Sequence, residues 1–246
     1  MNVTAQQTEP NTHEMVVIHR IFRREFPLLA GIVPRASDGD TGRAAPIAKH
    51  IEFCLDGLHN HHSAEDEYLW PALQERARPH AELVRRMEVQ HEAVARHSEQ
   101  ARQLTGRWQV TPVPQKGTEL AATLSALSDA LAEHLDEEEV SILPLVREHI
   151  TVAEWEELGR KSFEKFPPSA RLVAMGQVLE DGTPEDRALF LGKAPAPARM
   201  MWHLGGRRKY QRYIGRVRGR PSDRLDQPPR RQPEVRRDLD AHRHRP

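Results

Sequence analysis

Apolar residues in the first 150 positions recur at alternating steps of three and four, which is the spacing of one helical face. Four segments carry this pattern, at about residues 12–33, 43–77, 80–105 and 117–149. Alternating β-branched runs and Asn-Gly hairpin signals are missing from the same region. The pattern predicts an all-α protein. The links between segments are short, with a loop expected at residues 105–117, so the simplest arrangement is an up-down-up-down four-helix bundle.

The remainder of the chain carries weaker helix signals. Thr151–Glu154 has the form of a capping box, and the helix that it opens should end near the "FPPSA" at residues 166–170. Further helices are expected from Thr183 and over about 196–217. We therefore expect three parts: the bundle at 12–150, a C-terminal helical extension at 151–218 and a basic tail at 219–246. The tail has too little apolar content to fold and is expected to be disordered.

Two matched stretches place polar residues inside the apolar faces: "HHSAEDEYLWPAL" at 61–73 and "HLDEEEVSILPLV" at 134–146. In each, a histidine precedes a glutamate by four, and the glutamate precedes a proline by six. The pairs His61 and His134, Glu65 and Glu138, and Pro71 and Pro144 are each 73 positions apart, and His19 and His91 are 72 apart. The spacing predicts two helical hairpins of one plan.

Two carboxylates on otherwise apolar faces need a partner. A bare carboxylate in such a place is costly, and no lysine or arginine shares the face near Glu65 or Glu138. A cation between the helices would satisfy both, because residues four apart lie on one face. The predicted metal ligands are His19, His61, Glu65, His91, His134 and Glu138. Imidazole with carboxylate suits iron, manganese or zinc, and two glutamates can bridge two ions.

Some assignments stay open at this point. His59 and His62 neighbour His61, and either could support the site or be a ligand in a shifted register. His61 is preferred because its counterpart is His134, whereas the counterpart of His62 is Leu135. Tyr68 is the one obvious proton donor near the glutamates, and its alternative role is a core residue. The histidines without a repeated carboxylate partner are expected to have no metal role: His13, His50, His80, His97 and His149.

Net charge divides the chain. The formal charge is zero overall, but residues 199–246 hold 15 Lys/Arg against 5 Asp/Glu, a net of +10 that leaves −10 for residues 1–198. The basic segment also carries Trp202, Tyr210 and Tyr213, a mixture that nucleic-acid and acidic-membrane binding use. Its apolar residues favour docking on the bundle instead, with a bend at the glycines 205 and 206: Met200, Leu204, Ile214 and Val217.

Cysteine content and hydropathy give an indication of the cellular compartment. The single cysteine, Cys54, excludes an intramolecular disulfide, fits a reducing compartment and is expected to be a small core residue. The first residues lack the basic and apolar regions of a signal peptide, and no stretch approaches 18 uninterrupted apolar residues. We expect a cytoplasmic protein with no membrane span. The oligomeric state is not predicted.

The motifs "VIHR", "HHSAEDEYLWPAL", "EVQHEAV" and "EHLDEEEVSILPLV" resemble those of the hemerythrin-like, HHE cation-binding family over about residues 12–150. The extension is similar to that of longer, actinobacterial members. The resemblance implies a four-helix bundle around two non-haem irons bridged by oxide or carboxylate. It implies a function in binding or sensing O2, NO or peroxide, or in holding iron. The alternative is a di-iron enzyme with catalase-like, peroxidase-like or oxidase activity.

The chain departs from the oxygen-carrying hemerythrins at two places. Their third helix supplies two histidines four apart, but the position four after His91 is Ala95. Their fourth helix uses a histidine and an aspartate five apart, but here His134 and Glu138 are four apart. These departures predict a set that is one histidine short and more open, and they argue against simple reversible oxygen carriage.

Overall fold

The structure, a computed structural model, describes residues 9–219, and every regular element in that range is helical. The four longest helices are α1 (His13–Ile32), α2 (Thr41–Ala64), α4 (Ala81–Val110) and α5 (Pro114–Glu137). The predicted all-α class is confirmed. The expected disordered tail lies outside the described residues, apart from Gly219, where α11 (Arg207–Arg218) ends.

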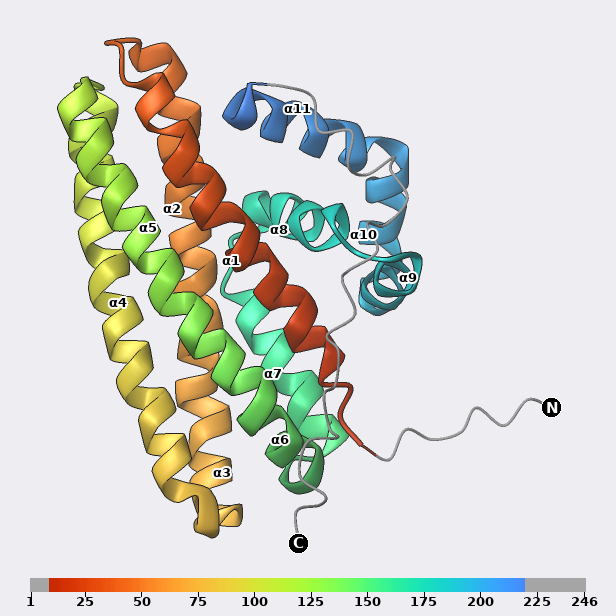
Figure 1. The fold of residues 1–246 in the computed structure, drawn as a ribbon. Helices are drawn as coiled ribbons and strands as arrows, with labels where there is room; N and C mark the ends of the chain where they lie inside the picture. Colours follow the sequence, from red (N-terminus) through yellow and green to blue (C-terminus); the bar gives the residue numbers. More distant parts are fainter. Residues whose placement is uncertain (1–8, 220–246) are drawn as a thin grey trace, which may run out of the picture.

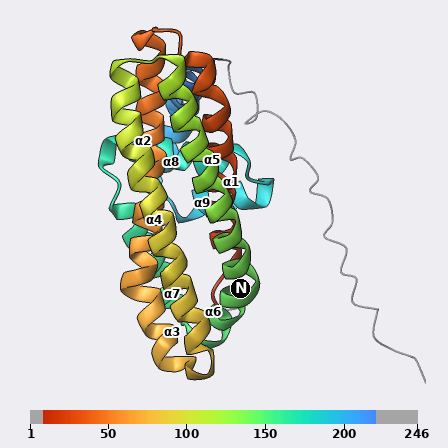
Figure 2. The same ribbon diagram turned by 60° about the vertical axis from the view of Figure 1, so that its left-hand side comes forward.

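The long helices pack in a ring. Helix α1 contacts α2 and α5, and α4 contacts the same two helices from the other side. Each runs antiparallel to the one before it, as Figures 1 and 2 show. Helix α2 continues through a π-helical segment, η2 (Glu65–Leu69), into α3 (Trp70–Arg76). Helix α5 continues in the same way through η4 (Glu138–Ile142) into α6 (Leu143–His149), so the two predicted hairpins share this feature.

Two apolar clusters fill the ring. Along α2, residues of the first cluster end at Leu58 and those of the second begin at Ala64. Large side chains such as Trp108 in the first and Trp70 in the second are fully buried. Burying each large apolar side chain contributes about 1.5–3 kcal/mol. The interval between the clusters on α2 holds His61 and His62, so a polar layer lies between two apolar ones.

The predicted loop at 105–117 is wrong over most of its length. Helix α4 runs on to Val110, and only residues 111–113 separate it from α5. Trp108 explains the extra turn, because its ring is buried and its Nε1–H donates to Ser37 Oγ at 2.8 Å. That burial outweighs the cost of Gly106 inside the helix, which is about 1 kcal/mol.

The extension packs against α1 and α2. It consists of α7 (Val152–Glu164), α8 (Pro168–Glu180), α9 (Pro184–Lys193), α10 (Ala196–Met201), the π segment η5 (Trp202–Gly206) and α11. Figure 1 shows α8 to α11 beside the ring, and contacts join α7 and α11 to α2 and join α8 to α1. The capping box predicted at Thr151 is present, and a second capping box begins the helix expected from Thr183. Helix α8 was not predicted as a separate element.

The basic segment predicted as a helix at 196–217 docks through its second half, α11, only. Tyr210, Ile214 and Val217 are fully buried on α11, whereas Met200 and Leu204 are exposed, so the docking prediction was wrong for those two. The backbone leaves helical geometry at Gly205, and Figure 1 shows α10 and α11 running in different directions. None of the helices within residues 9–219 combines the length and the apolar character needed to cross a bilayer.

Candidate metal centre

All six predicted ligands lie together inside the ring, and His62 joins them. None of the seven is more than 7% exposed. They come from all four long helices and both π segments: His19 on α1, His61 and His62 on α2, Glu65 on η2, His91 on α4, His134 on α5 and Glu138 on η4.

The seven side chains form two adjoining groups. His19, His61, Glu65 and Glu138 offer ligand atoms within 4.8 Å of one another, and so do His62, His91 and His134. Within the first group, His19 Nε2 is 3.3 Å from Glu138 Oε2, and His61 Nε2 is 3.3 Å from Glu65 Oε1. Within the second, the Nε2 atoms of His91 and His134 are 3.1 Å apart, and the rings of His62 and His91 stack at 4.0 Å.

Each glutamate reaches both groups. Glu65 Oε2 is 3.5 Å from His91 Nε2, while its other oxygen faces His61. Glu138 Oε2 is 3.8 Å from His134 Nε2 and also faces His19. Two carboxylates placed between two sets of imidazoles have the arrangement that bridging of two cations requires.

Three of the histidines are held from outside by their other ring nitrogen. His19 Nδ1 is 2.8 Å from Glu139 Oε1, His91 Nδ1 is 2.7 Å from Asp66 Oδ1, and His134 Nδ1 is 3.0 Å from Gln90 Oε1. An Nδ1–H that donates to these oxygens leaves the Nε2 lone pair facing inward, which is the usual support of a metal-binding histidine. Asp66 and Glu139 each directly follow a ligand glutamate, a repeat that the sequence contains and that our sequence analysis missed.

The inward atoms lack hydrogen-bond partners. Nine buried side-chain nitrogen or oxygen atoms have none in the part of the chain that the structure describes, and seven belong to this cluster. They are Nε2 of His19, His61 and His62 and both carboxylate oxygens of Glu65 and Glu138. Leaving such groups unpaired costs several kcal/mol. The residues therefore fit cations, which would engage these same atoms.

Electrostatics supports the same conclusion. Burial, and then the charge of Glu138, raise the pKa of Glu65 well above its usual value. Burial also acts to raise the pKa of Glu138, but His19 and other histidines lower it on balance. Burial lowers the pKa of His61 and His62 well below the usual value. Neutral imidazoles are the form that binds metal, and cations between the glutamates would let both carboxylates ionise.

The π segments begin at the ligand glutamates. The N–H of Trp70 donates to the carbonyl of Glu65, five residues back, and Leu143 donates to Glu138 in the same way. A proline follows directly in each half, and in a continuous α-helix its ring would clash with a carbonyl of the preceding turn. The wider turn accommodates the proline, which explains why glutamate and proline are six apart. Such π-bulges are frequent at functional sites.

Tyr68 and His59 do not join the cluster. The hydroxyl of Tyr68 donates to Glu67 Oε1 at 2.7 Å and the residue is 36% exposed, so Tyr68 is neither a proton donor beside the ligand glutamates nor a core residue. The physical reason is that a π turn adds one residue and rotates the positions after it away from the face. His59 is exposed and lies beside Ser63.

His62 is the residue that repeat counting disfavoured. It faces His91 and His134, while its neighbour His61 faces His19 and Glu65, so adjacent positions on α2 serve the two groups. The cluster is therefore not one histidine short as expected. Position 95 on α4 is alanine, but His62 on α2 brings the number of clustered histidines to five. The two consecutive histidines at 61 and 62 were the available signal. It was set aside because the counterpart of His62 in the second half is Leu135.

A helical protein with five histidines and two glutamates gathered in its interior belongs to the class of cation-binding helical proteins. A family model described as the hemerythrin HHE cation binding domain matches residues 11–146. The chain belongs to this family, as its motifs indicated. No curated protein and no solved structure matches the chain.

Proposed function

We propose that residues 12–150 form a hemerythrin-like four-helix bundle around a non-haem di-iron centre. The protein would bind or sense O2, NO or peroxide through this centre, or hold iron. One observation carries the proposal: seven buried side chains gather in the interior, and five of them carry nitrogen or oxygen atoms there that lack a hydrogen-bond partner. Membership of a cation-binding family supports it.

The two groups divide the ligands unequally. His19 and His61 would hold one iron, and His62, His91 and His134 the other, with Glu65 and Glu138 shared between them. Two irons would supply electron exchange and coordination positions for a small ligand. The side with two histidines has fewer side-chain donors, so we expect the open position there.

The surroundings restrict what could enter. The ring of Phe22 lies 5.5 Å from that of His61, and the indole of Trp70 lies 5.5 Å from the ring of His91. These aromatic side chains pack beside the histidines, which are nearly fully buried. A diatomic molecule or peroxide is the size of ligand that such a site admits.

The alternative is a di-iron enzyme with catalase-like, peroxidase-like or oxidase activity. Repeated turnover needs a proton donor at the reacting atoms. Tyr68, the residue expected in that role, points outward to Glu67. Asp66 and Glu139 already receive histidine Nδ1–H groups. We therefore favour binding or sensing over turnover.

Metal analysis of the purified full-length chain tests the proposal. Expression with added iron should give about two irons per chain, and the oxidised protein should absorb in the near-ultraviolet. Azide should change that spectrum if a position is open. Absence of bound metal after such expression would reject the di-iron centre, and vigorous oxygen evolution from peroxide would favour the enzyme.

A further inference from the structure

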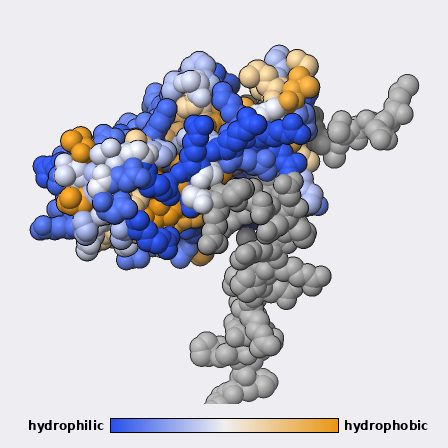
Figure 3. Space-filling view, turned by 90° about the horizontal axis from the view of Figure 1, so that it is seen from above, coloured by the Kyte–Doolittle hydropathy of each residue, from blue (hydrophilic) through white to orange (hydrophobic). Residues whose placement is uncertain are grey.

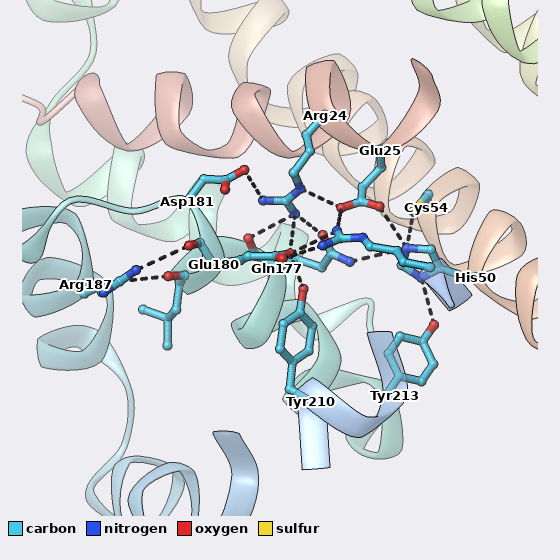
Figure 4. Close-up of polar contacts among 12 residues, drawn as sticks. Arg24, Glu25, His50, Cys54, Gln177, Glu180, Asp181, Arg187, Tyr210 and Tyr213 are labelled. Atoms are coloured by element: carbon cyan, nitrogen blue, oxygen red, sulfur yellow. Dashed lines mark hydrogen bonds and ion pairs between the residues drawn. The ribbon is translucent and has the colours of Figure 1, made fainter. Parts of the chain in front are cut away.

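A second cluster of metal-binding atoms lies between α1 and α2, away from the centre described above. Glu25 comes from α1, and His50 and Cys54 lie one turn apart on α2. Glu25 and His50 are fully buried and Cys54 is 4% exposed. One ligand atom from each lies within 4.8 Å of the others, and Figure 4 shows the three side chains meeting.

The distances suit one tetrahedral ion. His50 Nε2 is 3.1 Å from Glu25 Oε2 and 3.7 Å from Cys54 Sγ. Zinc binds sulfur at about 2.3 Å and nitrogen or oxygen at about 2.0–2.2 Å, which in a tetrahedron separates nitrogen from oxygen by about 3.4 Å and nitrogen from sulfur by about 3.5 Å. The two separations that involve His50 Nε2 are therefore within a few tenths of an ångström of these values.

The outer atoms of the cluster are held by neighbouring side chains. His50 Nδ1 is 2.8 Å from the hydroxyl of Tyr213 on α11. Glu25 Oε1 accepts from Arg24 Nε and Arg218 Nη2, each at 2.6 Å. On the inner side, His50 Nε2 contacts Glu25 Oε2, the Cys54 thiol and, at 3.5 Å, Gln177 Nε2. The histidines of the first centre are supported in the same manner.

The carboxylate ligand belongs to a wider network of ion pairs. Arg24 binds Glu25 and Asp181, and Arg218 binds Glu25 and Glu180. Arg187 binds main-chain carbonyls at the far end of this network (Figure 4). The network fixes the position of the carboxylate ligand.

We propose that Glu25, His50 and Cys54 form a second metal site, separate from the first, that takes one thiophilic divalent ion, zinc by its chemistry. On binding, the Cys54 thiol releases its proton to solvent and a sulfur–metal bond forms, with no change of oxidation state. A donor set of sulfur, nitrogen and oxygen suits zinc, whereas the first centre has no sulfur.

The site would couple metal binding to the docking of α11. Tyr213 orients the histidine ligand and Arg218 binds the carboxylate ligand, and both belong to α11. Tyr213 is thus a positioning residue. Tyr213→Phe should weaken metal binding about 10–100-fold, the range found when the outer partner of a metal-binding histidine is removed.

Cobalt(II) titration of the full-length, reduced protein provides the test. The chain has a single cysteine, so any thiolate-to-cobalt charge-transfer band must come from Cys54. We expect saturating cobalt to produce this band and zinc to abolish it by displacement. The band should vanish in Cys54→Ser and His50→Gln, with circular dichroism checking that each variant is folded.

Two controls separate this site from the first. His59→Gln, at an exposed histidine of the same helix, should leave the band intact. Glu65→Gln with Glu138→Gln should remove metal from the first centre and also leave the band intact. A folded wild-type protein that gives no band at saturating cobalt, or a band that survives His50→Gln, would overturn the second site without touching the di-iron proposal.

Discussion

Two buried carboxylates determine how the stability of the interior depends on bound metal. Glu65 and Glu138 each have two buried oxygens without a hydrogen-bond partner, so the metal-free chain carries a penalty that bound cations would remove. The same two residues therefore act in opposite directions on the loaded and on the metal-free protein. A buried residue that is not a metal ligand would not have these opposite effects, so they identify a ligand.

The substitution Glu65→Gln tests that opposition. We expect bound iron to fall from about two per chain to one or none, because the amide is a poor bridging ligand. The metal-free variant should melt at the same temperature as the metal-free wild type or higher, since a neutral amide costs less to bury. Elemental analysis and thermal melts with and without chelator measure both effects. Glu67→Gln, at an exposed carboxylate of the same π segment, is the matched control and should change neither.

Asp66 acts on the centre through His91. Asp66→Asn removes the charge that holds His91 Nδ1–H, and we expect metal affinity to fall about 10–100-fold while the helical content is retained. Competition with a chelator of known affinity gives the measurement. Asp56→Asn, which affects only a surface pair with Arg102, should leave the affinity unchanged. Equal losses in the two variants would mean that Asp66 has no special role.

At the level of helices, the alternating steps of three and four between apolar positions predicted the four long helices. The two matched motifs, with the matched pair His19 and His91, predicted six of the seven clustered residues. The π segments could not be predicted this way, since one added residue shifts the face that later positions occupy. Tyr68 was misplaced for that reason. His62 was misjudged because counting between halves assumes one inward residue per turn, whereas adjacent positions on α2 face different neighbours. Helix α8 was missed because it packs on α1 and α11, which are distant from it in the sequence.

The close packing of α8 on α11 rests on a glycine. A Cβ at Gly176 would stand 2.2 Å from the ring of Tyr210, so Gly176→Ala should lower the free energy of unfolding by about 1–3 kcal/mol. In Gly159→Ala, the matched control in α7, the new methyl group meets nothing within 4 Å, and that variant should be stabilised by up to about 1 kcal/mol. Urea unfolding measures both. A neutral Gly176→Ala would contradict the docked position of α11.

The contact between α3 and α7 depends on pH. Arg76 and the Thr151 cap lower the pKa of Glu154 to about 2. A lowered pKa means that this contribution is present above the unfolded-state value of about 4.5 and is lost as the pH falls toward 2. Glu154→Gln should therefore destabilise the protein at pH 7 by no more than about 1 kcal/mol, because the pair is partly exposed. Melts at pH 7 and pH 3 should show the difference shrinking at the lower pH.

For the whole molecule, the distribution of charge opposes nucleic-acid binding. Residues 1–198 carry a net of −10 against +10 in residues 199–246. Arg218 is occupied by Glu25 and Glu180. Arg208, Lys209, Arg212 and Arg216 remain exposed on α11, on a face that Figure 3 shows to be largely hydrophilic. Four exposed cations beside an acidic body favour weak, nonspecific contact with phosphates rather than a dedicated interface.

Filter-binding titrations with duplex DNA at two salt concentrations test this expectation. We expect a dissociation constant no tighter than the nonspecific range of about 10⁻⁴–10⁻⁶ M at physiological salt. Replacing the four exposed cations of α11 together with glutamine should abolish what remains. The same replacement should leave thermal stability nearly unchanged, because Tyr210, Ile214 and Val217, rather than these cations, bury the helix. Tight binding to one DNA sequence that is lost in this variant would instead identify the exposed face of α11 as a nucleic-acid interface.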